Sequence, residues 1–193
     1  MGKRDTKQHI LEVAADIVHL KGFNATGIQE VLAAAGVPKG SFYFHFKSKE
    51  DFGLQLLDFY DGHFDGLLQK ALAGPEGTVL EKLRLFFRGF RDYFAGCGYT
   101  RGCPIGNLAQ EMGDQNEAFR QKIAEVWQKM TGAVAAALEQ ARQVGELPVD
   151  FPVQKTAEFI VNSWEGALIR QKITRNSEPL DLFEEIIFGK ILK

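Results

Sequence analysis

Apolar residues recur at intervals of three and four along almost the whole chain, and this spacing is what most constrains the fold. Ile10, Val13, Ile17 and Leu20 follow it in the first segment. Such an interval places side chains on one face of an α-helix, whereas a half-buried β-strand alternates apolar and polar residues. Strand-like alternation is nearly absent, so the sequence predicts an all-α fold.

Glycine and proline divide this pattern into about nine expected helices, because glycine can end a helix in the left-handed conformation and proline suits a helix start. Thr26 is the expected N-cap of the second helix and Ser48 that of the fourth. The expected helices cover approximately 5–21, 26–36, 39–45, 52–73, 78–95, 104–112, 117–144, 153–175 and 180–191. We expect a small domain over residues 1–50 and a helical body over residues 51–193.

Composition and charge restrict the class of protein. The chain of 193 residues contains no apolar run near the roughly 18 to 20 residues that a membrane helix needs, and its first ten residues lack the apolar stretch of a signal peptide. Two cysteines argue against a disulfide framework. These features fit a cytoplasmic protein that does not associate with a membrane.

The net charge of −2 conceals a difference between the two parts of the chain. Residues 1–50 carry seven basic and five acidic side chains, whereas the remainder carries sixteen basic and twenty acidic ones. A surface that faces nucleic-acid phosphates is therefore expected in the first part.

Four aromatic residues stand almost together in GVPKGSFYFHFKSKEDF, residues 36–52, and not all of them can be core. On a helix that begins near Pro38, Phe42 and Phe46 lie four residues apart and share an inward face. A short helix, a tight glycine turn and another short helix form the outline of a helix-turn-helix, whose second helix enters the DNA major groove.

The remaining side chains of this short helix form the predicted DNA-contacting face. Gly40 permits close approach to bases, and Tyr43, His45 and Lys49 can donate to phosphates. The predicted contact residues are Lys39, Gly40, Ser41, Tyr43, Phe44, His45 and Lys49. In the alternative interpretation, the exposed aromatics form a protein contact patch and the lysines a solvated edge.

Capping, turn, core and contact residues recur together in GFNATGIQEVLAAAGVPKGSFYFHFKSKEDF, residues 22–52. These residues are Gly22, Phe23, Thr26, Ile28, Ala35, Gly36, Val37, Gly40, Phe42, Tyr43, His45, Phe46, Ser48, Lys49 and Glu50. The combination resembles the DNA-binding region of the TetR family of bacterial transcriptional regulators. Gly27 and Pro38 depart from the family pattern, which usually has small polar residues there.

The resemblance implies a DNA-binding head followed by an all-helical body that binds a ligand and dimerises. It also implies that Thr26 touches the DNA backbone at the start of the second helix and that Lys49 holds a phosphate. The implied partners are a double-stranded operator, a small-molecule effector and a second copy of the chain. Two heads about one DNA turn apart would read a palindromic operator.

The last two expected helices carry more apolar surface than a terminal hairpin needs for its own packing. The predicted dimer interface consists of Phe159, Ile160, Ala167, Leu168, Phe183 and Ile187. In the alternative interpretation these residues are the core of the single chain.

Aromatic residues in the body could line an apolar effector cavity, with polar residues that orient the ligand. The candidate ligand-binding residues are Phe90, Cys103, Asn107, Glu111, Trp127 and Trp164, with Asn162 and Glu165 as further polar candidates. An aromatic stripe at helical spacing is also typical of plain core.

Cys103 precedes Pro104, at the expected start of a helix and near Arg101. Both the helix dipole and the cation would lower the pKa of its thiol. With Cys97 nearby, a redox or electrophile sensor is an alternative to a non-covalent effector, and two small, semi-buried hydrophobic residues without chemistry are another. We expect no metal and no cofactor, because the cysteine spacing does not fit zinc and no histidine lies nearby.

We weigh three functions: a ligand-released repressor, a repressor switched at a thiol, and an enzyme built on a helical body. The enzyme hypothesis lacks support, because the chain shows no nucleophile triad, phosphate loop or plausibly spaced carboxylate pair.

Overall fold

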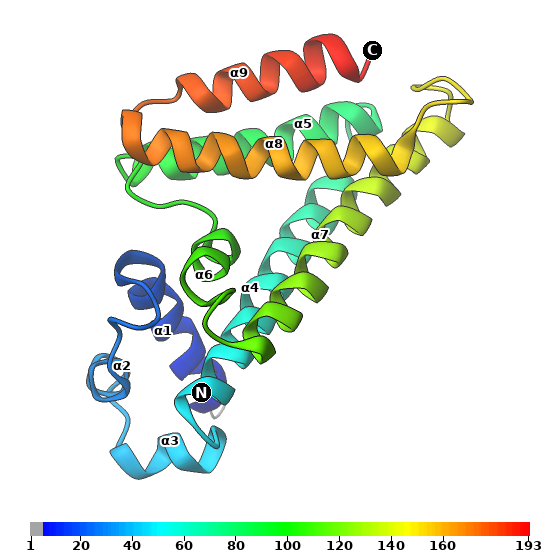
Figure 1. Ribbon diagram of the computed structural model, residues 1–193. Helices are drawn as coiled ribbons and strands as arrows, with labels where there is room; N and C mark the ends of the chain where they lie inside the picture. The colour runs from blue at the N-terminus through cyan, green and yellow to red at the C-terminus, as the bar shows by residue number, and fades with distance from the viewer. Residues whose placement is uncertain (1–5) are drawn as a thin grey trace. The chain divides into compact units, whose positions relative to one another are not determined.

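The computed structural model describes residues 6–193 of the chain (Figure 1). Its helices are α1 (Thr6–Lys21), α2 (Ile28–Ala35), α3 (Lys39–His45), α4 (Lys49–Leu72), α5 (Val79–Gly96), α6 (Pro104–Met112), α7 (Glu117–Gln143), α8 (Val153–Thr174) and α9 (Glu178–Ile186). The described residues form nine helices and no strand, which confirms the all-α prediction.

The end of the last helix differs from the expectation of one regular helix up to residue 191. After α9 the chain makes a π-helical turn, Ile187–Ile191, in which Leu192 N–H donates to the Ile187 carbonyl at 2.9 Å. The wider turn leaves Ile187 fully buried. The spacing of apolar residues did not predict it, because π-helical turns are rare and seldom extend beyond a single turn.

The chain forms two compact units. We call the described residues up to Asp61 together with Pro104–Val126 the head unit, and Gly62–Cys103 together with Trp127–Lys193 the body unit. The head unit therefore contains α6 and the first part of α7 in addition to α1–α3 and the start of α4. The boundary after residue 50 remains a prediction.

The head unit has an aromatic core. Phe42 and Phe46 are buried, as expected, and their rings lie 5.6 and 5.2 Å from the ring of Phe52 on α4. The ring of Phe23 lies 5.1 Å from that of Phe119 on α7. These contacts hold α3 against α4 and join the turn after α1 to α7.

The body unit is built around a second apolar core, to which α5, α7, α8 and α9 contribute. Its aromatic centre includes Phe87 and Trp164, whose ring centroids lie 4.9 Å apart. Glu184 of α9 accepts hydrogen bonds from Arg84 and Arg88 of α5 at 2.7 and 2.8 Å. Burial alone would raise the pKa of Glu184, but the two guanidinium groups lower it.

Within residues 6–193, every helix falls short of the combined length and apolar character required to cross a bilayer.

Candidate nucleic-acid interface

Helix α3 separates its buried and exposed side chains sharply, although it has only seven residues. Phe42 has no exposed surface, whereas Phe44 is 85% exposed and Tyr43 61% exposed. Lys39 and Gly40 are also exposed, and Ser41 and His45 are half-buried. The face that the sequence assigns to DNA is thus available to a partner on the surface of the head unit.

A left-handed glycine sets the turn between α2 and α3. Gly36 ends α2 with a φ of +65°, a conformation that glycine adopts without strain. The next N–H group, that of Val37, donates to the Leu32 carbonyl at 3.0 Å. The expected end of the second helix is confirmed, and the turn gives the helix-turn-helix its tight connection.

Thr26 does not cap the second helix, which corrects the expectation. The N-cap is Gly27, and the Thr26 hydroxyl donates back to the Gly22 carbonyl at 2.7 Å. The side chain is only 2% exposed, because the turn folds over it. Its predicted contact with the DNA backbone is untested, but the hydroxyl is already engaged in this turn.

Lys49 lies at the start of α4, directly after Ser48. The Ser48 hydroxyl accepts a hydrogen bond from the Asp51 N–H at 3.0 Å, which makes Ser48 the N-cap as expected. The Lys49 ammonium group donates to the Asn24 carbonyl at 3.1 Å and lies 5.0 Å from the centre of the Phe23 ring. Lys49 is therefore held against the turn that precedes α2.

Asp51 stabilises the same helix start. Its carboxylate accepts the Lys47 N–H at 2.8 Å and the Gln55 side-chain amide at 3.0 Å. These hydrogen bonds lower the pKa of Asp51 below its ordinary value, with the Lys47 N–H as the largest cause. The segment that links α3 to α4 is thus fixed by local contacts.

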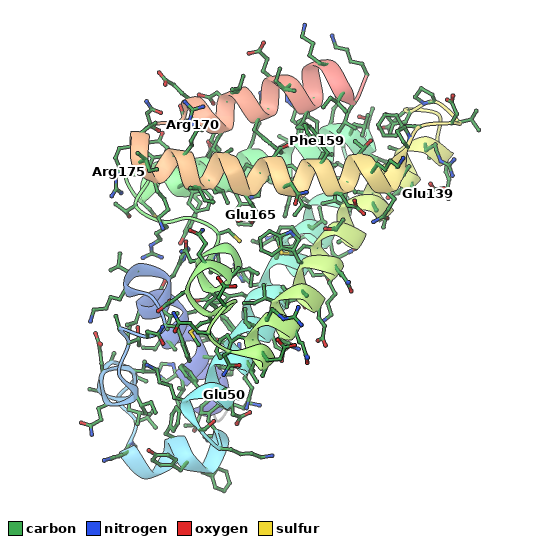
Figure 2. All side chains as sticks on the ribbon, viewed as in Figure 1. Glu50, Glu139, Phe159, Glu165, Arg170 and Arg175 are labelled. Atoms are coloured by element: carbon green, nitrogen blue, oxygen red, sulfur yellow. The ribbon has the colours of Figure 1, made fainter. Side chains whose placement is uncertain are left out.

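An apolar groove lies on the body unit between α8 and α9, which pack against each other (Figure 1). Its volume is about 240 Å³. Phe159 and Leu182 along it are each 51% exposed, and Ile186 is 39% exposed. Figure 2 shows Phe159 and Arg170 at two places along α8, and both line the groove.

The predicted dimer-interface residues remain a prediction, and they differ in exposure within the single chain. Ile160 and Leu168 are 0% and 2% exposed and belong to the core of the body unit, so they have no surface to offer to a second chain. Ala167, Phe183 and Ile187 line the groove but are also largely buried. The side of α8 that lines the groove includes Phe159, Ser163, Gly166 and Arg170. It is adjacent to the buried side of the helix, which carries Ile160 and Leu168.

The predicted ligand-binding residues fall into both units. Phe90, Trp127 and Cys103 are partly buried at the edge of the body-unit core, and Trp164 is buried within it. Asn107 and Glu111 belong to α6 and hence to the head unit. Both oxygens of the Glu111 carboxylate accept main-chain N–H groups, those of Phe23 and Asn24.

Cys103 lies beside a buried carboxyl group that its sequence neighbourhood does not reveal. Glu165 of α8, labelled in Figure 2, is 7% exposed. Its carboxyl group forms a hydrogen bond with Cys103. Burial raises the pKa of Glu165 to about 7, an effect that the Cys103 hydrogen bond partly offsets. An ionised Glu165 would oppose a thiolate at Cys103, against the effect expected from the helix start.

Two further contacts connect α8 to the loop before α6. The Gln171 side chain donates to the Arg101 carbonyl at 3.2 Å, and Arg175 donates to the Tyr99 carbonyl at 3.2 Å. The Arg101 guanidinium donates to the Tyr93 hydroxyl at 2.9 Å.

Over the described part of the chain, no group of three or more His, Cys, Asp or Glu side chains is arranged so that it could hold a metal ion.

The chain matches two family models. Residues 10–56 match the model of the bacterial regulatory proteins of the tetR family. Residues 79–187, more than half of the chain, match the tetracyclin repressor-like C-terminal domain. The chain belongs to the TetR family.

Relatives within the TetR family extend over nearly the whole chain. The transcriptional regulator AcuR of Cereibacter sphaeroides is 40% identical over 183 residues, which cover 92% of this chain and 82% of that protein. The transcriptional repressor DhaR of Mycobacterium sp. strain GP1 is 29% identical over 192 residues, covering 100% and 95%. A crystal structure of a TetR regulatory protein from Rhodobacter sphaeroides has a TM-score of 0.86 at 37% identity and covers 96% of this chain and 97% of that one.

This TetR-family protein is thus a DNA-binding transcriptional regulator, as the resemblance implied. The sequence located the exposed face of α3, because cap, turn and core residues there lie close together in the chain. It missed the contact of Glu111 with the turn between α1 and α2 and the exposed groove residue Leu182. These residues lie near others that are distant in sequence, and only the fold brings them together.

Proposed function

We propose that the protein is a homodimeric repressor that leaves a palindromic operator when the body unit binds a small apolar or aromatic molecule. The exposed face of α3 carries the proposal. Phe42 and Phe46 anchor the helix, and Tyr43 and Phe44 project from it with much of their surface free. A seven-residue helix of this kind can enter a major groove and contact base edges and phosphates.

The residues that we assign to DNA contact follow from exposure. Lys39, Gly40 and Phe44 would face the groove, with Ser41 at its edge. Tyr43, His45 and Lys49 would donate to phosphates, which fixes position without reading sequence. We assign Thr26 a supporting role, because its hydroxyl binds the Gly22 carbonyl. Since the operator is DNA, we infer that the protein acts in the bacterial cytoplasm.

The groove between α8 and α9 supports the dimer proposal. Exposed apolar side chains and Gly166 line this groove. The lack of a side chain at Gly166 allows a second helix to approach closely. Dimerisation of this face would cover Phe159, Leu182 and Ile186. Two copies related by a two-fold axis would then present two α3 helices to a palindrome.

Repression is proposed on the relationship to DhaR, which is named a repressor. The effector would meet the body-unit core at partly buried aromatic residues, of which Phe90 and Trp127 are our candidates. The thiol-switched alternative is not favoured, because an ionised Glu165 carboxylate beside Cys103 would oppose a thiolate there. No step of this proposal requires catalysis by the protein.

The test begins with selection of a binding duplex by the purified protein from a random-sequence DNA library. Affinity for that duplex is then measured by fluorescence anisotropy across a salt series. We expect a palindromic sequence, a steep loss of affinity with salt, and a slope that falls by about 0.9 when Lys49→Gln removes one phosphate contact. Failure to select any sequence would contradict the proposal. Retained binding after treatment of the wild type with a quinone would remove the thiol alternative.

A further inference from the structure

Glu111, near the end of α6, accepts two main-chain hydrogen bonds from the turn between α1 and α2. Phe23 N–H donates to its Oε2 at 2.7 Å, and Asn24 N–H donates to its Oε1 at 2.6 Å. One carboxylate thus holds two successive peptide groups of the turn between α1 and α2. Hydrogen bonds to a charged acceptor are roughly twice as strong as neutral ones.

The turn is shaped to receive this carboxylate. Gly22 has a φ of +88°, and a Cβ atom there would lie 3.0 Å from Glu111 Oε2. A side chain at this position would therefore crowd the carboxylate as well as strain the backbone. On the other side of the turn, the Phe23 ring is buried between Phe52 and Phe119. The turn has a fixed position as long as Glu111 stays in place.

Lys49 contacts the same turn through the main-chain carbonyl of Asn24. The N–H group of Asn24 binds Glu111, and its carbonyl accepts from the Lys49 ammonium at 3.1 Å. The ammonium also lies 5.0 Å from the Phe23 ring centre. The positions of Glu111 and Lys49 are therefore coupled through two residues.

Helix α6 also has a direct covalent connection to the body unit. Cys103 is the last residue of the body-unit segment, and Pro104 begins α6. Helix α6 has nine residues and carries Glu111 in its last turn.

We propose that Glu111 is a positioning residue for operator binding, which holds the Phe23–Asn24 turn, and through it Lys49, where Lys49 can contact a DNA phosphate. The inference rests on the proposed function, because it requires Lys49 to bind the operator. Glu111 itself touches no DNA.

The test compares Glu111→Ala, Glu111→Gln and Lys49→Gln on the duplex that the wild type selects. The control is Glu117→Ala, which removes the same charge from an exposed position of the head unit. General electrostatics predicts that loss of an acidic residue strengthens DNA binding. We expect the opposite for Glu111→Ala, a loss of about tenfold from two charge-assisted hydrogen bonds. Glu111→Gln keeps one acceptor and should lose less, and Glu117→Ala should bind as well as the wild type or slightly better.

The salt dependence separates positioning from simple loss of folded protein. If Glu111 acts through Lys49, Glu111→Ala lowers the salt slope by about the same amount as Lys49→Gln, roughly 0.9. The double variant then shows little further loss of affinity. Partial unfolding would instead lower the active fraction, measured by stoichiometric titration, and leave the slope unchanged. If Glu111→Ala does not fold, the smaller effects of Glu111→Gln carry the same comparison.

Three results overturn the inference: wild-type affinity and slope in both Glu111 variants, tighter binding than the wild type, or losses that add fully to that of Lys49→Gln. These results leave the proposed function intact, because the wild type still binds its operator. If the wild type selects no duplex, the proposed function fails and the inference fails with it.

Discussion

Glu165, in the middle of α8, forms a hydrogen bond with Cys103, the residue that immediately precedes α6. One oxygen of this carboxyl group, Oε1, is buried and lacks a hydrogen-bond partner. A buried carboxyl group with incomplete hydrogen bonding favours its neutral form, which accounts for its raised pKa. The burial of this carboxyl group therefore makes the stability of the body unit sensitive to pH.

Replacing Glu165 should remove a pH-dependent loss of stability. The pKa of Glu165 is about 7 in the folded protein and has an ordinary value of 4.5, so the folded state binds more protons between these values. Stability from this group is full below about pH 4.5 and is lost as the pH rises through about 7, by roughly 3 kcal/mol. We expect Glu165→Gln to be more stable than the wild type at pH 8 in urea unfolding.

The matched control for this prediction is Glu158→Gln on the exposed face of the same helix. It should leave the pH profile of the wild type unchanged. A profile that is the same for the wild type and Glu165→Gln would mean that Glu165 is already ionised at neutral pH or is hydrated.

Phe42 and Phe44 should separate folding from recognition. Phe42→Ala removes a fully buried ring and should lower the free energy of unfolding by about 3 to 5 kcal/mol. Phe44→Ala removes an 85% exposed ring and should change it by less than about 0.5 kcal/mol. It should nevertheless weaken operator binding. Chemical denaturation and anisotropy on the selected duplex measure the two effects, and a large stability loss in Phe44→Ala would contradict the assigned exposure.

Phe159→Asp should shift the protein from dimer to monomer. The ring is half exposed in the α8–α9 groove, and a dimer would bury it, so a carboxylate there would be desolvated without a partner. Analytical ultracentrifugation should show a dissociation constant at least tenfold higher. Val149→Asp is the control, because Val149 is 84% exposed and lies outside the groove. Unchanged association of both variants would locate the interface elsewhere.

Gly53 and Gly62 on α4 should respond in opposite directions to alanine. A Cβ atom at Gly53 would overlap the Phe119 ring and lie 2.6 Å from that of Phe23. The overlap should cost about 1 to 3 kcal/mol and outweigh the better helix propensity of alanine. At Gly62 no atom lies within 4 Å of the added Cβ, so alanine should stabilise the helix by up to about 1 kcal/mol. Thermal denaturation of the two variants provides the check, and equal shifts would contradict the packing of Phe119.

The sequence by itself determined the features that depend on neighbours within a few residues. The helical spacing, the left-handed end of α2 at Gly36 and the Ser48 cap all follow from local hydrogen bonds and backbone preferences. The burial of Phe42 and the exposure of Phe44 also follow, because residues two apart on a helix point to different faces. The family pattern consists of such local features, which is why it could be recognised.

The tertiary structure decided which apolar face meets which partner. Ile160 and Phe159 are adjacent in sequence, but one is core and the other is exposed, since the rotation of α8 depends on its packing against α9 and on the contact of Trp164 with Phe87 of α5. Gly27, and not Thr26, is the N-cap of α2, and the Thr26 hydroxyl donates to the Gly22 carbonyl instead. Glu111 and Phe23 are 88 residues apart in sequence. They come into contact only because the fold brings α6 against the turn between α1 and α2. Local chemistry specifies the elements, whereas contacts across long separations in sequence depend on how the whole chain packs.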